Sequence, residues 1–184
     1  MMFLNLVWLL LQLTIVLGPP ATAVLYTLSK KMVDEEPWDF QDVWRLLREL
    51  FWPAWKWAVP NLVVLLVVVA NFYTYQGFQG GGWMALRLFW GAFLISWFIL
   101  NLFFWPFWLV QENRSLRTTY TNAARLFILH PLTVIVIAIL TGIVFTVSAS
   151  LVFLLAAGVM GWLALAGIIA VQGSLALQQK KSAL

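Results

Sequence analysis

Few side chains in this chain could do acid–base or nucleophilic chemistry, and their spacing does not bring them together. The sequence has seven Asp and Glu residues, one His and no Cys. The lack of Cys excludes disulfides, thiolate catalysis and thiolate metal sites. No His-x-x-x-His, paired-carboxylate or activated-serine pattern occurs, and no carboxylate lies within an apolar stretch, where a proton relay would need one. We therefore expect a protein that is not an enzyme and that holds no cofactor or metal.

The best polar cluster is Glu112-Asn113-Arg114 together with Arg117. It is either the solvated start of a helix, which Ser115 can cap, or a contact for a soluble or membrane partner. We include Glu112, Asn113 and Arg117 among the candidate partner-binding residues.

Composition places the whole chain in a membrane. Of its 184 residues, 63% are hydrophobic and only 10% are charged, which is far from the composition of a soluble domain. We predict a single membrane domain, 1–184, that is all-α with five transmembrane helices and an interfacial amphipathic helix. The predicted spans are 3–28, 59–76, 83–110, 131–148 and 151–176.

The Lys and Arg residues predict the orientation. All except Arg87 fall between the first and second spans, between the third and fourth, or after the last. Loops rich in Lys and Arg stay cytoplasmic, so we expect a bacterial cytoplasmic membrane protein with its N-terminus outside and its C-terminus inside. The net charge of +4 is spread over these loops, which indicates attraction to anionic lipids and not nucleic-acid binding.

The first span contains Gly18-Pro19-Pro20. Two prolines remove two backbone donors, so we expect the helix to kink or unwind there, with the Thr22 hydroxyl repairing part of the hydrogen-bond ladder. The break is either a simple kink or an unwound element that binds a solute.

Residues 37–56 predict an amphipathic helix. Its apolar side chains recur at steps of three and four, with Gln41, Asp42, Arg45, Arg48 and Glu49 on the other face, and Arg45 can pair with Glu49. Such a helix lies in the cytoplasmic headgroup layer or binds a partner protein. The apolar face consists of Phe40, Val43, Trp44, Leu47, Leu50, Phe51 and Ala54.

The third span carries Trp83, Trp90, Trp97 and Phe104 at steps of seven. These rings drift by only about 20° per step and form one aromatic stripe. The stripe either packs against lipid or docks another membrane subunit.

Several of these features together resemble the YesL-like family of bacterial membrane proteins. Two departures are Pro20 after the usual single proline, and a chain that is shorter and richer in Trp. The resemblance rests on Asn5-Leu6, Trp8, Gly18-Pro19, Ala21-Thr22-Ala23, Leu25-Tyr26, the segment Trp44 to Trp57, Glu112-Asn113, Arg117 and Asn122-Ala123 before His130-Pro131.

The resemblance implies an accessory role in sugar uptake, because family members are often encoded beside carbohydrate ABC importers. Our leading hypothesis is a non-enzymatic subunit that binds the ABC permease subunits through the third span and the amphipathic helix. The alternative is a small transporter or channel that uses the broken first helix as a solute-binding element.

Overall fold

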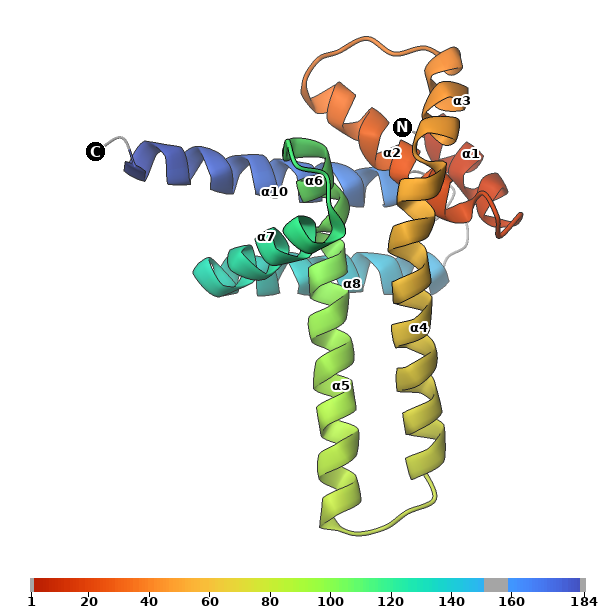
Figure 1. The fold of residues 1–184 in the computed structure, drawn as a ribbon, viewed down its shortest axis with the longest axis vertical. Coiled ribbons are helices and arrows are strands. Elements are labelled where there is room, and N and C mark those ends of the chain that lie inside the picture. Colours follow the sequence, from red (N-terminus) through yellow and green to blue (C-terminus); the bar gives the residue numbers. More distant parts are fainter. Residues whose placement is uncertain (1, 151–158, 183–184) are drawn as a thin grey trace.

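The computed structural model describes residues 2–150 and 159–182, and all regular elements in them are α-helices (Figure 1). The all-α prediction is thus confirmed. The helices are α1 Met2–Gln12, α2 Gly18–Val33, α3 Phe40–Glu49, α4 Phe51–Tyr75, α5 Gly81–Leu102, α6 Phe104–Val110, α7 Leu116–Leu129, α8 Pro131–Ser150 and α10 Val159–Ser182.

Several of these helices are long and apolar enough to cross a bilayer, as expected of a multi-pass membrane protein. In the described residues three segments qualify, namely Phe51–Tyr75, Gly81–Val110 and Met160–Lys180. The pair Leu116–Leu129 and Pro131–Val144 is bent by 108° and adds a fourth candidate if it counts as one span. The described structure therefore offers three or four candidate spans where the sequence predicted five.

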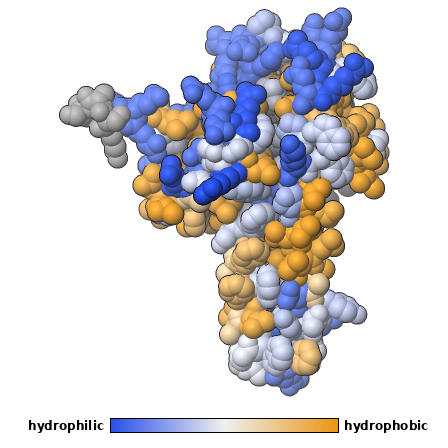
Figure 2. Space-filling view, in the orientation of Figure 1, coloured by the Kyte–Doolittle hydropathy of each residue, from blue (hydrophilic) through white to orange (hydrophobic). Residues whose placement is uncertain are grey.

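Helices α4 and α5 form an antiparallel hairpin that projects from a body made by the other helices (Figure 1). At 1.5 Å per residue, the 25 residues of α4 measure about 37 Å, more than the roughly 30 Å hydrocarbon core. Its only buried side chains are Ala54 and Val68. Apolar side chains cover much of the hairpin in Figure 2, so a bilayer is the environment in which this surface is stable.

The body lies across this hairpin. In Figure 1, α8 and α10 run across the direction of α4 and α5, so a bilayer whose normal follows the hairpin would hold α10 strongly tilted. Predicted boundaries also shift here. The turn expected at 148–150 belongs to α8, and the predicted start of the fifth span, 151–158, lies outside the described residues.

The first predicted span, 3–28, is two helices and not one broken helix. The interruption covers residues 13–17, and Pro19 and Pro20 occupy the first turn of α2. Proline is well tolerated there because those N–H groups have no intrahelical partner, so the prolines begin a helix and do not break one. Helix α1 has 11 residues and is about 16 Å long, too short to cross a membrane.

Helix α1 folds back along α2. Leu4, near the start of α1, lines a small groove together with Leu28 and Val43, whereas Trp8 donates from its indole Nε1 to the Thr22 hydroxyl at 3.0 Å. The beginning of α1 therefore lies beside the end of α2, close in sequence to Lys30. The α1–α2 pair therefore returns the chain to the side where it started, whereas a transmembrane span would carry it to the opposite side.

The amphipathic segment predicted at 37–56 is shorter in the structure. Asp39 caps α3 by accepting from the Asp42 N–H at 2.9 Å, and the chain turns at Leu50 before α4 begins. Helix α3 buries Val43, Leu46 and Leu47 against the body. The residues from Phe51 onward belong to α4, the first long helix of the hairpin. The predicted segment ran past Leu50 because the hydrophobic pattern continues through the turn there.

The third predicted span is also interrupted, at Phe103, between α5 and α6. Helix α6 lies in the centre of the body, where Phe104 and Trp105 are almost fully buried. Helix α10 passes close to it: a Cβ added to Gly167 would lie 3.0 Å from Cγ of Pro106. The glycine therefore permits the close helix contact that membrane proteins build with small residues.

Candidate functional site

Two short motifs meet at the base of the α4–α5 hairpin. Trp57 precedes Asn61 by four residues in α4, and Trp97 precedes Asn101 by four residues in α5. Each indole reaches across to the other helix: Trp57 Nε1 donates to Asn101 Oδ1 at 2.9 Å, and Trp97 Nε1 donates to Asn61 Oδ1 at 2.7 Å. We call these four side chains the Trp–Asn clamp.

The clamp is also closed within each helix. Asn61 Nδ2 donates to the Trp57 carbonyl at 2.7 Å, and Asn101 Nδ2 donates to the Trp97 carbonyl at 2.9 Å. Each amide therefore holds its own helix with its nitrogen and the opposite helix with its oxygen. This pairing satisfies polar groups that would be costly in an apolar setting.

Tyr120 ties the clamp to α7. Its hydroxyl donates to Asn101 Oδ1 at 3.0 Å and accepts from Asn61 Nδ2 at 3.3 Å. Its ring stacks on Trp97, with centroids 5.4 Å apart, and packs against Phe104. Through these contacts Tyr120 joins the clamp of α4 and α5 to α7.

Sequence reasoning missed this site. A signal was available, because the motif Trp-x-x-x-Asn occurs twice, once in each of two consecutive apolar helices. The motif does not reveal that each indole N–H donates to the Asn side chain of the other helix.

The aromatic stripe lies mainly against the rest of the chain. Trp83 stacks on Phe78 in the hairpin turn, with centroids 4.6 Å apart, Trp97 belongs to the clamp, and Phe104 is fully buried. Trp90 is half-buried and touches neighbouring rings of its own helix. Trp97 and Phe104 therefore turn toward α4 and the body, whereas Trp83 is exposed and stays open to lipid or to a partner.

The polar groups at the interruption between α1 and α2 bind one another. The Thr22 hydroxyl accepts from Trp8 Nε1 and from Gln12 Nε2 at 3.1 Å, and donates to the Gly18 carbonyl at 3.1 Å. We expected Thr22 to repair a broken ladder, but Pro19 and Pro20 lie in the first turn of α2, where no intrahelical bond is lost. Gln12 Nε2 also reaches the Gly18 carbonyl at 3.0 Å, so these polar groups bind one another across the break. Gly18, Pro19 and Pro20 start a helix whose partner is α1.

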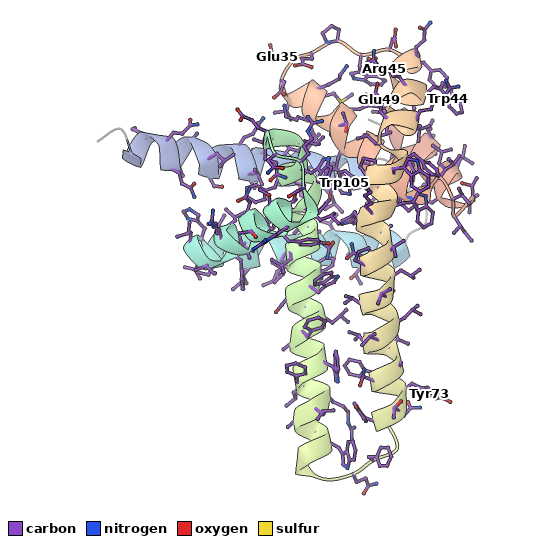
Figure 3. The ribbon with its side chains drawn as sticks, in the orientation of Figure 1. Glu35, Trp44, Arg45, Glu49, Tyr73 and Trp105 are labelled. Carbon is purple, nitrogen blue, oxygen red and sulfur yellow. The ribbon has the colours of Figure 1, made fainter. Side chains whose placement is uncertain are left out.

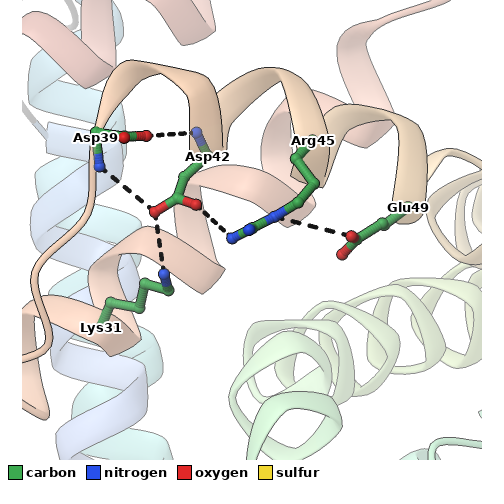
Figure 4. A network of polar contacts seen from close by, with 5 residues as sticks. All are labelled: Lys31, Asp39, Asp42, Arg45 and Glu49. Atoms are coloured by element: carbon green, nitrogen blue, oxygen red, sulfur yellow. Dashed lines mark hydrogen bonds and ion pairs between the residues drawn. The ribbon is translucent and has the colours of Figure 1, made fainter.

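The polar face of α3 carries a chain of ion pairs (Figure 4). Lys31 of α2 contacts Asp42 at 3.2 Å, Arg45 also pairs with Asp42, and Arg45 lies 3.8 Å from Glu49, as the sequence predicted. The hydrogen bond from Lys31 holds the pKa of the Asp42 carboxyl below its ordinary value, with help from the Asp39 N–H and from Arg45. These contacts fasten α3 to α2.

The other face of α3 is partly free. Trp44 packs edge-on against Phe40, and both residues are 52% exposed. Both were assigned to the apolar face of the helix, yet the body covers only part of that face. Trp44 thus remains open to a lipid headgroup layer or to a partner.

The cluster before α7 is exposed. Ser115 caps the helix, as predicted, by accepting from the Thr118 N–H at 3.1 Å. Glu112, Asn113 and Arg117 lie on the surface, and within the described ranges 2–150 and 159–182 none of their side chains makes a hydrogen bond or an ion pair. They are not brought together with Trp44 or with the stripe into one site.

In the part of the chain that the structure describes, no three His, Asp or Glu side chains converge as a metal site would require. No protein-family model, curated protein or solved structure matches this chain.

Proposed function

We propose that this protein is a non-enzymatic subunit of a bacterial membrane complex and that it binds an integral membrane partner along its α4–α5 hairpin. The observation that carries the proposal is the exposure of this hairpin. Only Ala54 and Val68 of α4 are buried, whereas Val63 and Leu66 are more than half exposed. A helix surface of this kind contacts either lipid or another transmembrane helix.

The clamp supports the proposal because it fixes the base of the hairpin to the body. The hairpin leaves the body where the Trp–Asn clamp and Tyr120 hold α4, α5 and α7 together. Tyr73, 75% exposed, lies toward the far end of the hairpin, and Trp105 lies in the body (Figure 3). A partner helix could thus pack along the hairpin without displacing the contacts of the body.

For the partner we propose the permease subunits of a carbohydrate ABC importer. This choice rests on the resemblance to the YesL-like family alone. On the cytoplasmic side, Trp44 and the cluster of Glu112, Asn113 and Arg117 are further exposed groups that such a complex could use.

For the orientation we propose that the loops rich in Lys and Arg are cytoplasmic and that the hairpin turn at Gly80 is external. The α1–α2 hairpin favours an N-terminus on the cytoplasmic side, which revises the orientation expected from the sequence. Because the chain has no Cys, single cysteines can be placed without background. A cysteine at position 80 should react with an impermeant maleimide in intact cells, whereas cysteines at positions 2 and 112 should react only after permeabilisation.

The partner is tested by photocrosslinking in cells. A benzophenone amino acid at Leu66, which is 59% exposed, should crosslink to a permease subunit identified by mass spectrometry. The same group at Val68, which is 1% exposed, is the matched control and should not. If position 66 yields only lipid adducts or uncrosslinked protein, the proposed docking along α4 is refuted.

The alternative role as a transporter or channel finds less support. It requires polar groups at the helix break that are free to bind a solute, yet Gln12, Gly18 and Thr22 bind one another there. Solute flux into proteoliposomes that is abolished by replacing Pro19 and Pro20 with Ala would favour it nonetheless.

A further inference from the structure

A cavity of about 200 Å³ lies where six helices of the body and hairpin meet. Its lining comes from α2, α4, α5, α6, α8 and α10, and includes Thr22 of the helix break and the clamp residues Trp57 and Asn101. The cavity therefore borders both polar sites described above, the hydrogen bonds around Thr22 and the Trp–Asn clamp. Among the residues that the structure describes, those that line the cavity carry no charge.

Two hydroxyls of this lining are left without partners. The indole Nε1 of Trp105 also has no acceptor, but it has almost no accessible surface and so does not face the cavity. The hydroxyls of Tyr26 and Thr141 make no hydrogen bond in the described part of the chain, although both residues are buried. An unpaired polar group in an apolar setting is costly, and most buried groups in folded proteins avoid it.

Water is a poor candidate for filling the cavity. An ordered water needs two to four polar partners, and an apolar cavity of about 150 Å³ stays dry and accepts benzene. Two free hydroxyls could hold one water of about 30 Å³, but the rest of the lining is apolar or aromatic, including Phe98 and Leu163, and most of the volume of about 200 Å³ would stay unfilled.

From this combination we infer that the cavity binds an uncharged, membrane-soluble molecule with one ring and carbonyl oxygens, which is the chemistry of a quinone. The volume accommodates a substituted six-membered ring, and aromatic side chains pack well against a flat ring. A carbonyl oxygen accepts hydrogen bonds from a hydroxyl, and the hydroxyls of Tyr26 and Thr141 both lack partners. The absence of charge from the lining favours a neutral ligand over a lipid headgroup.

This inference concerns a ligand site inside the protein and goes beyond the proposed docking along α4. It is tested with the full-length protein in detergent, using duroquinone as the probe and 1,2,4,5-tetramethylbenzene as the matched compound without carbonyl oxygens. The measurement is the shift of the unfolding midpoint with increasing compound, which reports binding to the folded state. We expect a saturable rise with duroquinone and an apparent affinity for tetramethylbenzene that is lower by about tenfold or more.

Variants then assign the site. Removing one hydroxyl, by Tyr26→Phe or Thr141→Val, should weaken duroquinone binding by about fivefold to tenfold each. Tyr73→Phe, at an exposed position of α4 remote from the cavity, is the control and should bind as the wild type does. The unfolding midpoint without compound shows whether each variant folds. If Thr141→Val does not fold, Tyr26→Phe alone tests whether the cavity binds duroquinone. Equal affinity for the two compounds, no saturable binding, or unchanged binding by Tyr26→Phe would each overturn the inference.

Discussion

Replacing Asn101 by Leu should loosen the base of the hairpin. The side-chain oxygen of Asn101 accepts from Trp57 Nε1 at 2.9 Å and from the Tyr120 hydroxyl at 3.0 Å, so the substitution removes two long-range hydrogen bonds at similar volume. An interhelical hydrogen bond in a membrane protein averages about 0.6 kcal/mol, and an unpaired buried donor costs about 1–3 kcal/mol. We therefore expect a loss of about 2 kcal/mol in the free energy of unfolding.

The assay is reversible unfolding in mixed micelles with increasing dodecyl sulfate, followed by circular dichroism. Asn71→Leu is the matched control, because Asn71 lies on α4 and its amide donates only to the Val67 carbonyl of its own helix. That variant should change the unfolding free energy by less than about 0.5 kcal/mol.

A double-mutant cycle isolates the cross-helix bond. Trp57→Phe and Asn101→Leu should each destabilise the protein, and together they should cost less than the sum of the two, because both remove the same hydrogen bond. Additive effects, or equal stability of Asn101→Leu and Asn71→Leu, would refute the reasoning that the clamp holds the hairpin.

Three further predictions concern the body. Gly167→Ala places a Cβ 3.0 Å from a ring carbon of the α6 proline and should destabilise the protein by about 1 kcal/mol, whereas Gly173→Ala, with nothing within 4 Å, should be neutral or stabilising in the same unfolding assay. Thr22→Val removes the acceptor for the indole and amide donors of α1 and should expose α1 to proteolysis; Thr27→Val, whose hydroxyl donates only to a carbonyl of its own helix, should not. The lowered pKa of Asp42 means that its ionised form stabilises the α2–α3 contact above about pH 4 and that this contribution is lost as the pH falls through the lowered value. Asp42→Asn should thus lower the unfolding midpoint at pH 7, and its difference from the wild type should vanish in acid; a constant difference would contradict this origin.

The position of the helix break shows where sequence reasoning reaches its limit. Pro19 and Pro20 do mark an interruption near Gly18, but they stand at the start of α2 and the gap precedes them. Proline is compatible with a helix start and incompatible with a helix interior, and only the fold of α1 against α2 decides which applies. The same packing turns a predicted span into a hairpin, because Trp8 and Gln12 find their acceptor on Thr22.

By itself the sequence predicted apolar helices able to span a membrane, the helical class, the cap at Ser115 and the pairing of Arg45 with Glu49. These properties follow from composition and from contacts within about one helical turn, where the chain has little choice of partner. Only the tertiary structure decided that Trp57 binds Asn101 and that Trp97 binds Asn61, that Trp97 and Phe104 of the aromatic stripe face inward, and that a cavity lies among six helices. Those contacts join residues far apart along the chain, and their choice depends on how whole helices pack and not on any local pattern.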